Sequence, residues 1–201
     1  MKPKISFIYF DVGSVIIDNA AANRNIARDY HVDERDVIKI RSEHWRTACR
    51  GVLGNADYMD IFTKTLGITH PSHDATDFLS DYQLPIAETH ALIRDLHTRY
   101  RMGIFSNAER GILKKLLQKK RIPDIPWEVI VDSSELGTIK PEQKIYEFAE
   151  RRASVPPAEI FFVDDILLHL EAAKDRGWQG MVFDPDDVRG SVRKLRRILR
   201  V

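Results

Sequence analysis

The 201-residue sequence contains one cysteine, Cys49, which excludes an intrachain disulfide and a zinc site built from several cysteines. A chain so poor in cysteine fits a reducing compartment, and we expect a cytoplasmic location. No apolar run approaches the roughly 18 residues of a membrane helix. Asp11 interrupts the apolar start of the chain, so no targeting segment is expected. Neither charge dominates, because 31 Lys and Arg stand against 30 Asp and Glu, which argues against a protein dedicated to nucleic-acid binding.

The composition is that of a chain that builds a core. Hydrophobic residues make up 43% of the sequence and charged residues 30%, a mixture typical of globular proteins and not of disordered chains. The length corresponds to one domain of medium size, or to a domain that carries a smaller insertion.

Two hydrophobic periodicities alternate along most of the chain. Short apolar runs predict buried strands at residues 5–10, 102–105, 129–131, 160–163 and 181–183. Helical spacing predicts helices at 91–100, at 109–120, from Pro141 onward and at 167–176, where Gly177 suits the end of the helix. Alternating strands and helices predict an α/β fold, with a Rossmann-like parallel sheet covered on both faces.

Residues 18–88 depart from this alternation, and no strand is predicted there. Asp33 is expected to cap a helix that reaches about residue 48, and Asn55 to cap another that ends at Gly67. We therefore expect a small α-helical domain at 18–88, inserted into an α/β core formed by residues 1–17 and 89–201.

Polar residues follow the predicted strands or precede a predicted helix. They are Asp11, Ser106, Asn107, Lys140, Asp164 and Asp165. The carboxyl ends of the strands in such a sheet line one crevice, so we expect these residues to converge. Carboxylates bind hard cations such as Mg²⁺, and helix N-termini bind phosphate. Each residue alone has an ordinary explanation as a turn residue, a helix cap or a surface lysine, but their combination favours a functional site.

Four segments carry a resemblance: FDVGSVIID, IFSNAER, GTIKPEQKIYEFA and IFFVDDILLHLEAA. They resemble, in order, the four motifs of the haloacid dehalogenase-like (HAD) hydrolase superfamily. The first resembles the Asp-x-Gly motif of a phosphatase branch that includes bacterial sugar-1-phosphate phosphatases. The helical stretch at 18–88 stands where this family carries a helical cap, so the resemblance implies a hydrolytic core with such a cap.

The resemblance implies a phosphoryl-transfer site. Asp11 matches the nucleophile that forms an aspartyl-phosphate, which divides one difficult displacement into two easier ones. Ser106 and the N–H of Asn107 match the groups that bind the phosphoryl group. Lys140 matches the cation that neutralises the phosphoryl charge and keeps the nucleophile ionised.

The resemblance also implies a Mg²⁺ site. Asp11, the carbonyl of Gly13, Asp164 and Asp165 match the positions that bind the ion or support its ligands. A carboxylate that attacks a phosphate dianion is otherwise repelled, and the cation together with Lys140 removes that repulsion.

One position departs from the usual phosphatase pattern. Typical members carry a second Asp two residues after the nucleophile, as general acid and base, whereas this chain has Gly13. Three interpretations stay open. The substrates have leaving groups that need little help from a proton, as acyl phosphates and anomeric sugar phosphates do; another residue, Asp18 or His44, supplies the proton; or the protein is a regulatory phosphate-binding protein with little turnover.

Dehalogenation is a further alternative, because dehalogenases of this superfamily also lack the second Asp. They need no metal and lack the paired acids, so Asp164 and Asp165 favour the phosphatase. His169 stands where relatives often have Asn or Asp. It either orients Asp165 or lines the mouth of the site, or simply packs beside Leu170.

Other features have ordinary explanations. In the resembled family, cap residues set substrate choice, but Trp45 and Cys49 are expected to pack, and Arg46 and Arg50 to face solvent rather than grip a substrate. Residues 188–201 form a basic amphipathic pattern that is expected to dock its apolar stripe on the sheet rather than to touch a membrane or nucleic acid.

The sequence as a whole predicts a Mg²⁺-dependent phosphomonoesterase. Its substrate is expected to be a small phosphorylated metabolite, such as a sugar phosphate, hydrolysed through an aspartyl-phosphate. No nucleic-acid or membrane partner is expected, and the pattern leaves the oligomeric state open.

Overall fold

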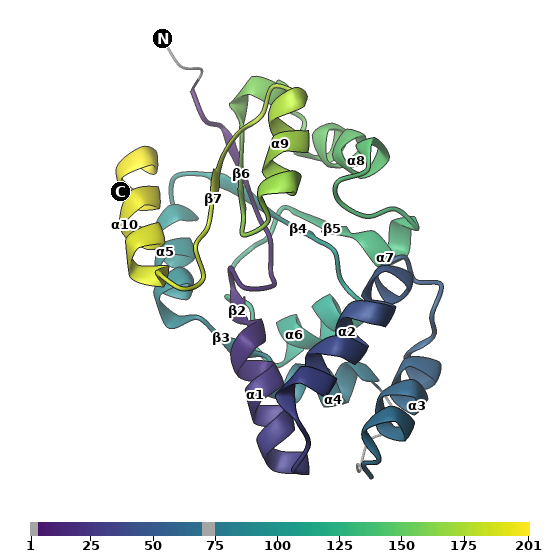
Figure 1. Cartoon of the computed structure of the whole chain (residues 1–201). Coiled ribbons are helices and arrows are strands. Elements are labelled where there is room, and N and C mark those ends of the chain that lie inside the picture. Colours follow the sequence, from purple (N-terminus) through teal and green to yellow (C-terminus); the bar gives the residue numbers. More distant parts are fainter. Residues whose placement is uncertain (1–3, 70–74) are drawn as a thin grey trace.

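The computed structural model describes residues 4–69 and 75–201 (Figure 1). Five parallel strands form the main sheet, in the order β5-β4-β1-β6-β7. The strands are β1 (Phe7–Phe10), β4 (Arg101–Ser106), β5 (Val129–Asp132), β6 (Ile160–Asp164) and β7 (Gln179–Val182). All five predicted strands exist, with ends shifted by one or two residues, and the expected Rossmann-like α/β fold is confirmed.

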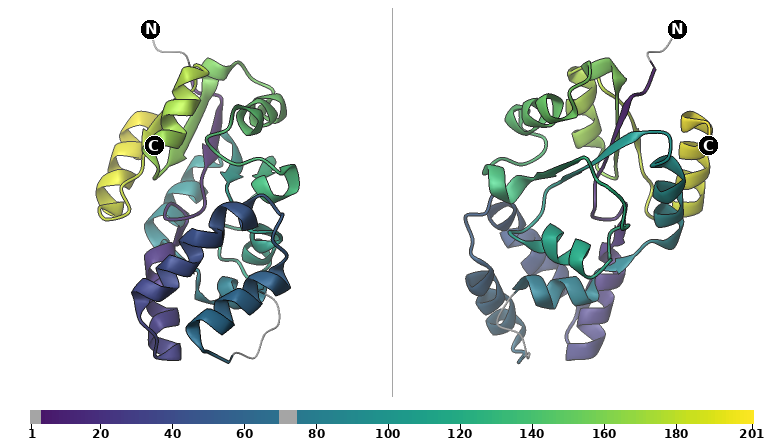
Figure 2. Two further views of the ribbon diagram at one scale, coloured as in Figure 1. Left: turned by 45° about the vertical axis from the view of Figure 1, so that its right-hand side comes forward. Right: turned by 180° about the vertical axis from the view of Figure 1, so that it is seen from behind.

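Helices cover both faces of this sheet. Successive side chains of a strand point to opposite faces, so Phe7 and Tyr9 pack toward one layer of helices, and Ile8 and Phe10 toward the other. The first layer contains α8 (Gln143–Ala153) and α9 (Leu167–Asp175), and the second contains α5 (Ala87–Leu96) and α10 (Val188–Leu199). Figure 2 shows α10 and α5 together on one side of the sheet. Burial on both faces explains why the central strand β1 is uniformly apolar.

Shorter elements connect the core. The helix predicted at 109–120 is α6 (Ile112–Gln118), and α7 (Ser133–Leu136) follows β5 directly. A 3₁₀ turn, η1 (Pro157–Glu159), precedes β6. Pro141 does not open a helix as predicted: it lies before α8, which begins at Gln143 with Glu142 at the N-cap, and the Lys140–Pro141 peptide bond is cis.

Four helices follow the first strand, at the lower end of the molecule in Figure 1. We call them the cap helices: α1 (Asn19–Tyr30), α2 (Glu34–Cys49), α3 (Asn55–Leu66) and α4 (Ala75–Tyr82). Asp33 caps α2 and Gly67 ends α3 as expected, whereas Gly54, not Asn55, is the N-cap of α3. Aromatic contacts join the helices, with the Phe62 and Phe78 rings 5.5 Å apart.

The expectation of no strand within residues 18–88 is wrong. Two short strands, β2 (Ile17–Asp18) and β3 (Leu84–Pro85), pair antiparallel where the chain enters and leaves the cap helices. The N–H of Ile86 donates to the carbonyl of Ile16 over 2.9 Å beside this pair. Two residues are too few to produce a periodic pattern, so only the meeting of the two chain segments creates these strands.

The C-terminal helix docks on the core as predicted. Val192, Leu195 and Leu199 of α10 are buried in the same apolar cluster as α5, and the hydroxyl of Tyr100 donates to the carbonyl of Leu199 over 2.8 Å. The basic side chains of α10 lie outside this stripe, which is the usual division of an amphipathic helix. Among the described residues, no helix is both long enough and apolar enough to cross a membrane.

Candidate active site

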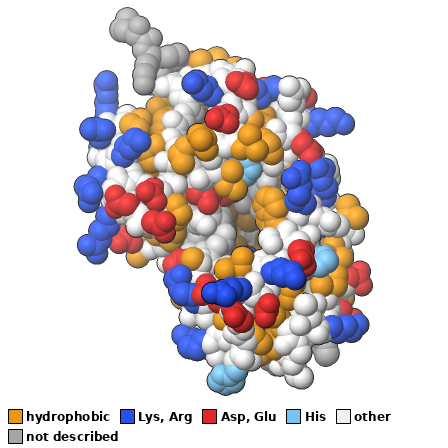
Figure 3. Space-filling model, in the orientation of Figure 1, with side chains coloured by type: hydrophobic (Ala, Val, Ile, Leu, Met, Phe, Trp, Pro, Cys, Tyr) orange, Lys and Arg blue, Asp and Glu red, His pale blue; other side chains and the backbone are white. Residues whose placement is uncertain are grey.

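The carboxyl ends of neighbouring strands bring the expected polar residues together. Asp11 directly follows β1, Ser106 ends β4 and Asp164 ends β6, and β1 lies between the other two strands. This end of the sheet faces the cap helices, and Figure 3 shows that the surface is hollowed between the core and these helices. The topology therefore puts the four sequence motifs at one crevice, as in other sheets of this kind.

Lys140 lies at the centre of the cluster. Its Nζ is 2.9 Å from Oδ1 of Asp11 and 2.6 Å from Oδ2 of Asp164, and it donates to the carbonyl of Phe105 over 2.9 Å. The side chain is only 1% exposed. Burial acts to lower the pKa of Lys140, but Asp11 and Asp164 raise it above the ordinary value. The geometry thus holds a charged ammonium between two carboxylates.

The carboxylates respond differently to the same burial. Burial raises the pKa of Asp11, with the Lys140 ammonium acting against that rise. Burial also acts to raise the pKa of Asp164, but Lys140 and His169 together hold it below the ordinary value. For Asp165, burial and the charges of Asp11 and Asp164 raise the pKa to about 7. Negative charge at this site therefore exceeds what Lys140 alone balances.

Three acidic residues lie close enough together to hold a divalent cation. Asp11, Asp164 and Asp165 each offer an oxygen, and these oxygens lie within 4.8 Å of one another. Mg²⁺ prefers carboxylate oxygens, and burial together with the charges of Asp11 and Asp164 raises the pKa of Asp165, so a cation beside these groups would be favourable. The donor set fits Mg²⁺, whereas the expected contribution of the Gly13 carbonyl stays a prediction.

His169 contacts a different acid from the one expected. Its Nδ1 lies 3.0 and 3.1 Å from the two carboxylate oxygens of Asp164, not against Asp165, and its carbonyl accepts from the hydroxyl of Tyr146 over 2.9 Å. The N–H of Ile166 also donates to Asp164, over 2.8 Å. The imidazole is buried and orients Asp164, so packing beside Leu170 is not its only role.

Asn107 holds the backbone of Lys140. Its Oδ1 accepts from the N–H of Lys140 over 2.7 Å, and its Nδ2 donates to the Lys140 carbonyl over 3.0 Å. The side chain thus links the loop after β4 to the loop before α8, and it places the lysine beside Asp11. Ser106 is buried at the end of β4, in register with Asp132 of β5. Their expected contacts with a phosphoryl group stay predictions.

The space beside Gly13 is filled by a residue that the sequence did not single out. The φ of Gly13 is not positive, but a Cβ at this position would lie 2.6 Å from Nδ2 of Asn19. The chain turns back here, because the carbonyl of Val12 accepts from the N–H groups of Ile16 and Ile17 over 2.9 and 3.0 Å. A polar first residue of a helix is too common to have drawn attention to Asn19.

The two proposed proton donors occupy other positions. Asp18 is the N-cap of α1, with Oδ1 accepting from the N–H of Ala21 over 2.7 Å. Its carboxylate is therefore used in part to satisfy the helix start. His44 is half-buried on α2. A role for either residue in proton transfer stays a prediction.

The C-terminal end of α2 is tied to the core. Arg50 forms an ion pair with Glu142 and donates to the carbonyl of Gly137 over 3.3 Å, so it contacts the core while its side chain stays 32% exposed to solvent. The hydroxyl of Ser133 donates to the carbonyl of Cys49 over 2.6 Å. These contacts attach the cap helices to the loop that carries Lys140.

Other cap residues match their ordinary explanations. Cys49 is buried, and burial followed by the charge of Glu109 raises the pKa of its thiol, which makes it an unreactive packing residue. Trp45 is half-buried and Arg46 is exposed.

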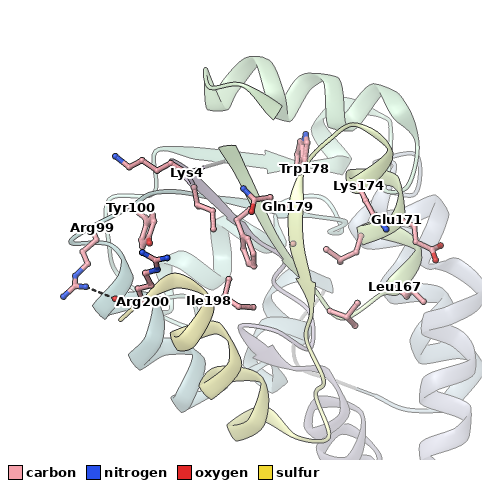
Figure 4. Close-up of a pocket in the computed structure, with 15 residues that line it drawn as sticks. Lys4, Arg99, Tyr100, Leu167, Glu171, Lys174, Trp178, Gln179, Ile198 and Arg200 are labelled. Atoms are coloured by element: carbon pink, nitrogen blue, oxygen red, sulfur yellow. Dashed lines mark hydrogen bonds between the residues drawn. The ribbon is translucent and has the colours of Figure 1, made fainter. Parts of the chain in front are cut away.

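A separate cavity of about 1100 Å³ lies along the edge strand β7 (Figure 4). Its lining combines apolar side chains such as Phe161 and Ile198 with basic residues such as Lys4 and Arg200. Arg99 donates to the carbonyl of Arg200 over 3.1 Å at one wall. None of the candidate site residues lines this cavity, so its size does not bear on the chemistry at Asp11.

The solved structures similar to this protein share its fold over nearly the whole chain. A HAD family enzyme from Bacteroides thetaiotaomicron, in complex with magnesium and inorganic phosphate, is 16% identical with a TM-score of 0.69, over 90% of this chain and 95% of that one. A predicted HAD-like family hydrolase from Porphyromonas gingivalis is 18% identical with a TM-score of 0.72, over 96% and 99%. L-2-haloacid dehalogenase from Xanthobacter autotrophicus, with chloropropionic acid covalently bound, is 20% identical with a TM-score of 0.68, over 88% and 76%.

Comparisons of sequence identify the family of the chain. Bifunctional epoxide hydrolase 2 from Rattus norvegicus is 29% identical over 72 residues, which are 36% of this chain and 13% of that protein, so the chain spans a small part of this relative. The family model described as haloacid dehalogenase-like hydrolase matches residues 5–177. This match covers most of the chain and includes all four motifs, and the protein therefore belongs to the haloacid dehalogenase-like hydrolases.

Proposed function

We propose that this protein is a Mg²⁺-dependent phosphatase that hydrolyses a small phosphorylated metabolite, such as a sugar phosphate, through an aspartyl-phosphate on Asp11. The observation that carries the proposal is the cluster of three carboxylates, Asp11, Asp164 and Asp165, with oxygens within 4.8 Å of one another and Lys140 bridging two of them. A cation site next to a carboxylate nucleophile suits the transfer of a negatively charged phosphoryl group.

Asp11 is the proposed nucleophile. Lys140 contacts its Oδ1, so Oδ2 is the oxygen available to attack phosphorus. A bond forms between this oxygen and phosphorus while the bond to the leaving oxygen breaks, and the electron pair of the broken bond stays with that oxygen. Water then attacks phosphorus, releases phosphate and restores the Asp11 carboxylate.

Lys140 and the metal ligands supply the charge balance. Asp11, Asp164 and Asp165 would hold the ion, which when bound supplies positive charge against the repulsion between the nucleophile and the phosphoryl oxygens. Lys140 favours the ionised form of Asp11 and holds its carboxylate in place, and Asn107 fixes the backbone of Lys140 through two hydrogen bonds. His169 turns the carboxylate of Asp164 toward the site.

Two other functions compete with this proposal. The structural likeness to a dehalogenase with chloropropionic acid covalently bound, together with Gly13, supports dehalogenation, which uses the same nucleophile without a metal. A regulatory phosphate-binding protein is compatible with Gly13 if turnover has been lost. The crowded carboxylates favour the phosphatase, since they have no use in a metal-free displacement of halide.

A substrate panel with metal control tests the three functions. We expect hydrolysis of some phosphorylated metabolites in Mg²⁺, loss of turnover in chelator, recovery on adding Mg²⁺ back, and none with Asp11→Asn. Full activity in chelator on an L-2-haloacid would establish the dehalogenase instead. Binding of phosphate without turnover on any ester would support the regulatory protein. A cytoplasmic location and the absence of nucleic-acid and membrane partners stay predictions beside this proposal.

A further inference from the structure

Asn19 occupies the space above Gly13. The carbonyl of Val12 accepts three backbone N–H groups in the turn after Asp11, so the chain doubles back and α1 begins close to the residue that it has just left. As a result, Nδ2 of Asn19 lies 2.6 Å from where a Cβ of residue 13 would be. Any side chain at residue 13 would therefore require the end of the Asn19 side chain to move.

The carboxamide is incompletely bonded. Its Oδ1 is buried, and within the described part of the chain it has no hydrogen-bond partner. Buried polar atoms are nearly always paired, by protein, water or ligand, because an unpaired one costs free energy. Asn19 therefore places a carboxamide with an unpaired Oδ1 beside Gly13, the position at which most phosphatases of the resembled type carry a carboxylate.

We propose that Asn19 contacts the oxygen that joins phosphorus to the leaving group, in place of the missing acid. This inference rests on the proposed phosphatase function and narrows it. A carboxamide donates an N–H hydrogen bond but does not release the proton at ordinary pH. The enzyme is therefore restricted to esters and anhydrides whose leaving oxygen departs as an anion.

The leaving group departs without help from a general acid. The phosphorus–oxygen bond breaks as Asp11 attacks, and both electrons of that bond stay on the leaving oxygen. Asn19 stabilises the charge of that oxygen by hydrogen bonding, and the departed anion takes its proton from water. Substrates with weakly basic leaving groups, such as acyl and anomeric sugar phosphates, meet this condition, whereas simple alkyl phosphates do not.

The substitution Asn19→Asp tests the proposal with almost no change of shape. It puts an ionisable carboxyl group where the carboxamide was, so kcat/KM for an alkyl phosphate should rise by as much as about 10²–10⁴-fold, the range of a well-placed general acid. The rate for an aryl phosphate should change little, and the dependence of rate on leaving-group pKa should flatten. Asn25→Asp, the same change on the same helix, should leave both rates unchanged.

Variants at Gly13 test the contact between a side chain at this position and Asn19. Gly13→Asp alone should rescue alkyl phosphates only weakly, because its side chain must displace the flexible end of the Asn19 side chain. Gly13→Asp combined with Asn19→Ala should rescue them, since alanine vacates the space. Rescue by the single variant as large as by the double variant would contradict the conflict between the two side chains.

Phosphate binding separates this inference from the proposed function. Inorganic phosphate in Mg²⁺ places an oxygen where the leaving oxygen would lie, so Asn19→Ala should weaken its binding by about five- to tenfold, the loss of one hydrogen bond. Calorimetry measures this whether or not any ester is hydrolysed. If the unmodified protein binds phosphate but hydrolyses nothing, the proposed function fails. The ratio of its phosphate affinity to that of Asn19→Ala then still tests whether Asn19 contacts the bound phosphate. Equal affinities, with an unchanged leaving-group dependence in Asn19→Asp, overturn the role of Asn19 alone.

Discussion

Lys140 is among the largest completely buried side chains in the described part of the chain, and its charge is neutralised by two acids at the ends of different strands. Removing one partner of a buried ion pair leaves an uncompensated charge, which costs more than the pair itself contributes. Here removal of the lysine would leave two carboxylates, Asp11 and Asp164, buried against each other. The same residue therefore controls both the charge at the proposed nucleophile and the stability of the metal-free fold.

Lys140→Met should abolish turnover and lower the free energy of unfolding of the metal-free protein by about 3–5 kcal/mol. Methionine keeps the volume of the side chain but leaves the carboxylates without a cation. Urea unfolding in chelator measures the loss. Lys144→Met, at an exposed lysine of α8, is the matched control and should change stability by less than about 0.5 kcal/mol. A stable, active Lys140→Met would contradict the role assigned to the ammonium.

The cap helices are attached to the core by side-chain contacts as well as by the two segments through which the chain enters and leaves them. The end of α2 contacts the core through the Arg50–Glu142 ion pair and through Arg110, which donates to the carbonyl of Gly51 over 2.9 Å. Glu142 also accepts from the hydroxyl of Thr138 over 2.8 Å. The link reaches the loop of Lys140, so the position of α2 and the position of the lysine depend on common contacts.

A double-mutant cycle over Arg50→Ala and Glu142→Ala should give a coupling energy of about 0.5–1 kcal/mol, because both side chains are partly exposed to water. Hydrogen exchange should be faster at the end of α2 in Arg50→Ala, since the tie to the core is lost. Lys39→Ala removes an exposed ion pair within α2 and should leave exchange at that end unchanged. Additive effects of the two substitutions would show that the pair does not hold the helix.

The docking of the amphipathic helix α10 on the core can be tested in the same way. Leu195 is 0% exposed in the contact with α5, whereas Ile198, three residues later, is 37% exposed. Leu195→Ala should lower the free energy of unfolding by about 2–5 kcal/mol, and Ile198→Ala by clearly less, because only the first leaves a cavity. Urea unfolding of the two variants compares them directly, and equal losses would contradict the docking of the helix.

The stability of the whole molecule should depend on pH and on bound Mg²⁺, because Asp11, Asp164 and Asp165 lie close together. Asp165 has an ordinary pKa of 3.8, which burial, Asp11 and Asp164 raise to about 7 in the folded protein. A folded state that binds a proton more tightly than the unfolded chain gains stability from it. This gain is complete below about pH 4 and is lost as the pH rises through about 7.

Mg²⁺ binding should therefore strengthen with pH, because the ion competes with the proton on Asp165. One released proton corresponds to a rise in affinity of about fivefold between pH 6 and pH 7, and about twofold from pH 7 to pH 8. Thermal unfolding should show a larger rise of Tm on adding Mg²⁺ at pH 8 than at pH 6. Calorimetry at the three pH values measures the affinities.

Asp165→Asn is the control for this linkage. An amide resembles the protonated acid, so the metal-free variant should be no less stable than the unmodified protein at pH 8, and its weaker Mg²⁺ binding should vary less with pH. An affinity that is constant from pH 6 to pH 8 in the unmodified protein would show that the carboxyl of Asp165 does not titrate in this range.

Much of the α/β core was predictable because its signals are local. The strands are apolar and short, and a strand–helix alternation admits few arrangements besides a covered parallel sheet, which puts Asp11, Ser106 and Asp164 at one end. The cap of α2 at Asp33 and the end of α3 at Gly67 are likewise encoded by single residues in their own segments. The roles of the matched residues came from the resemblance, and local pattern alone left each of them with an ordinary alternative.

By itself, then, the amino-acid sequence determined the periodicities, the order of strands and helices along the chain, and the chemical groups at the strand ends. Only the tertiary structure decided that Asn19 fills the space above Gly13, that His169 contacts Asp164, and that Arg50 pairs with Glu142. The physical reason is that these contacts depend on where separate segments meet and how their side chains turn. Periodicity within a segment carries no information about either, whereas packing the segments into one fold fixes both.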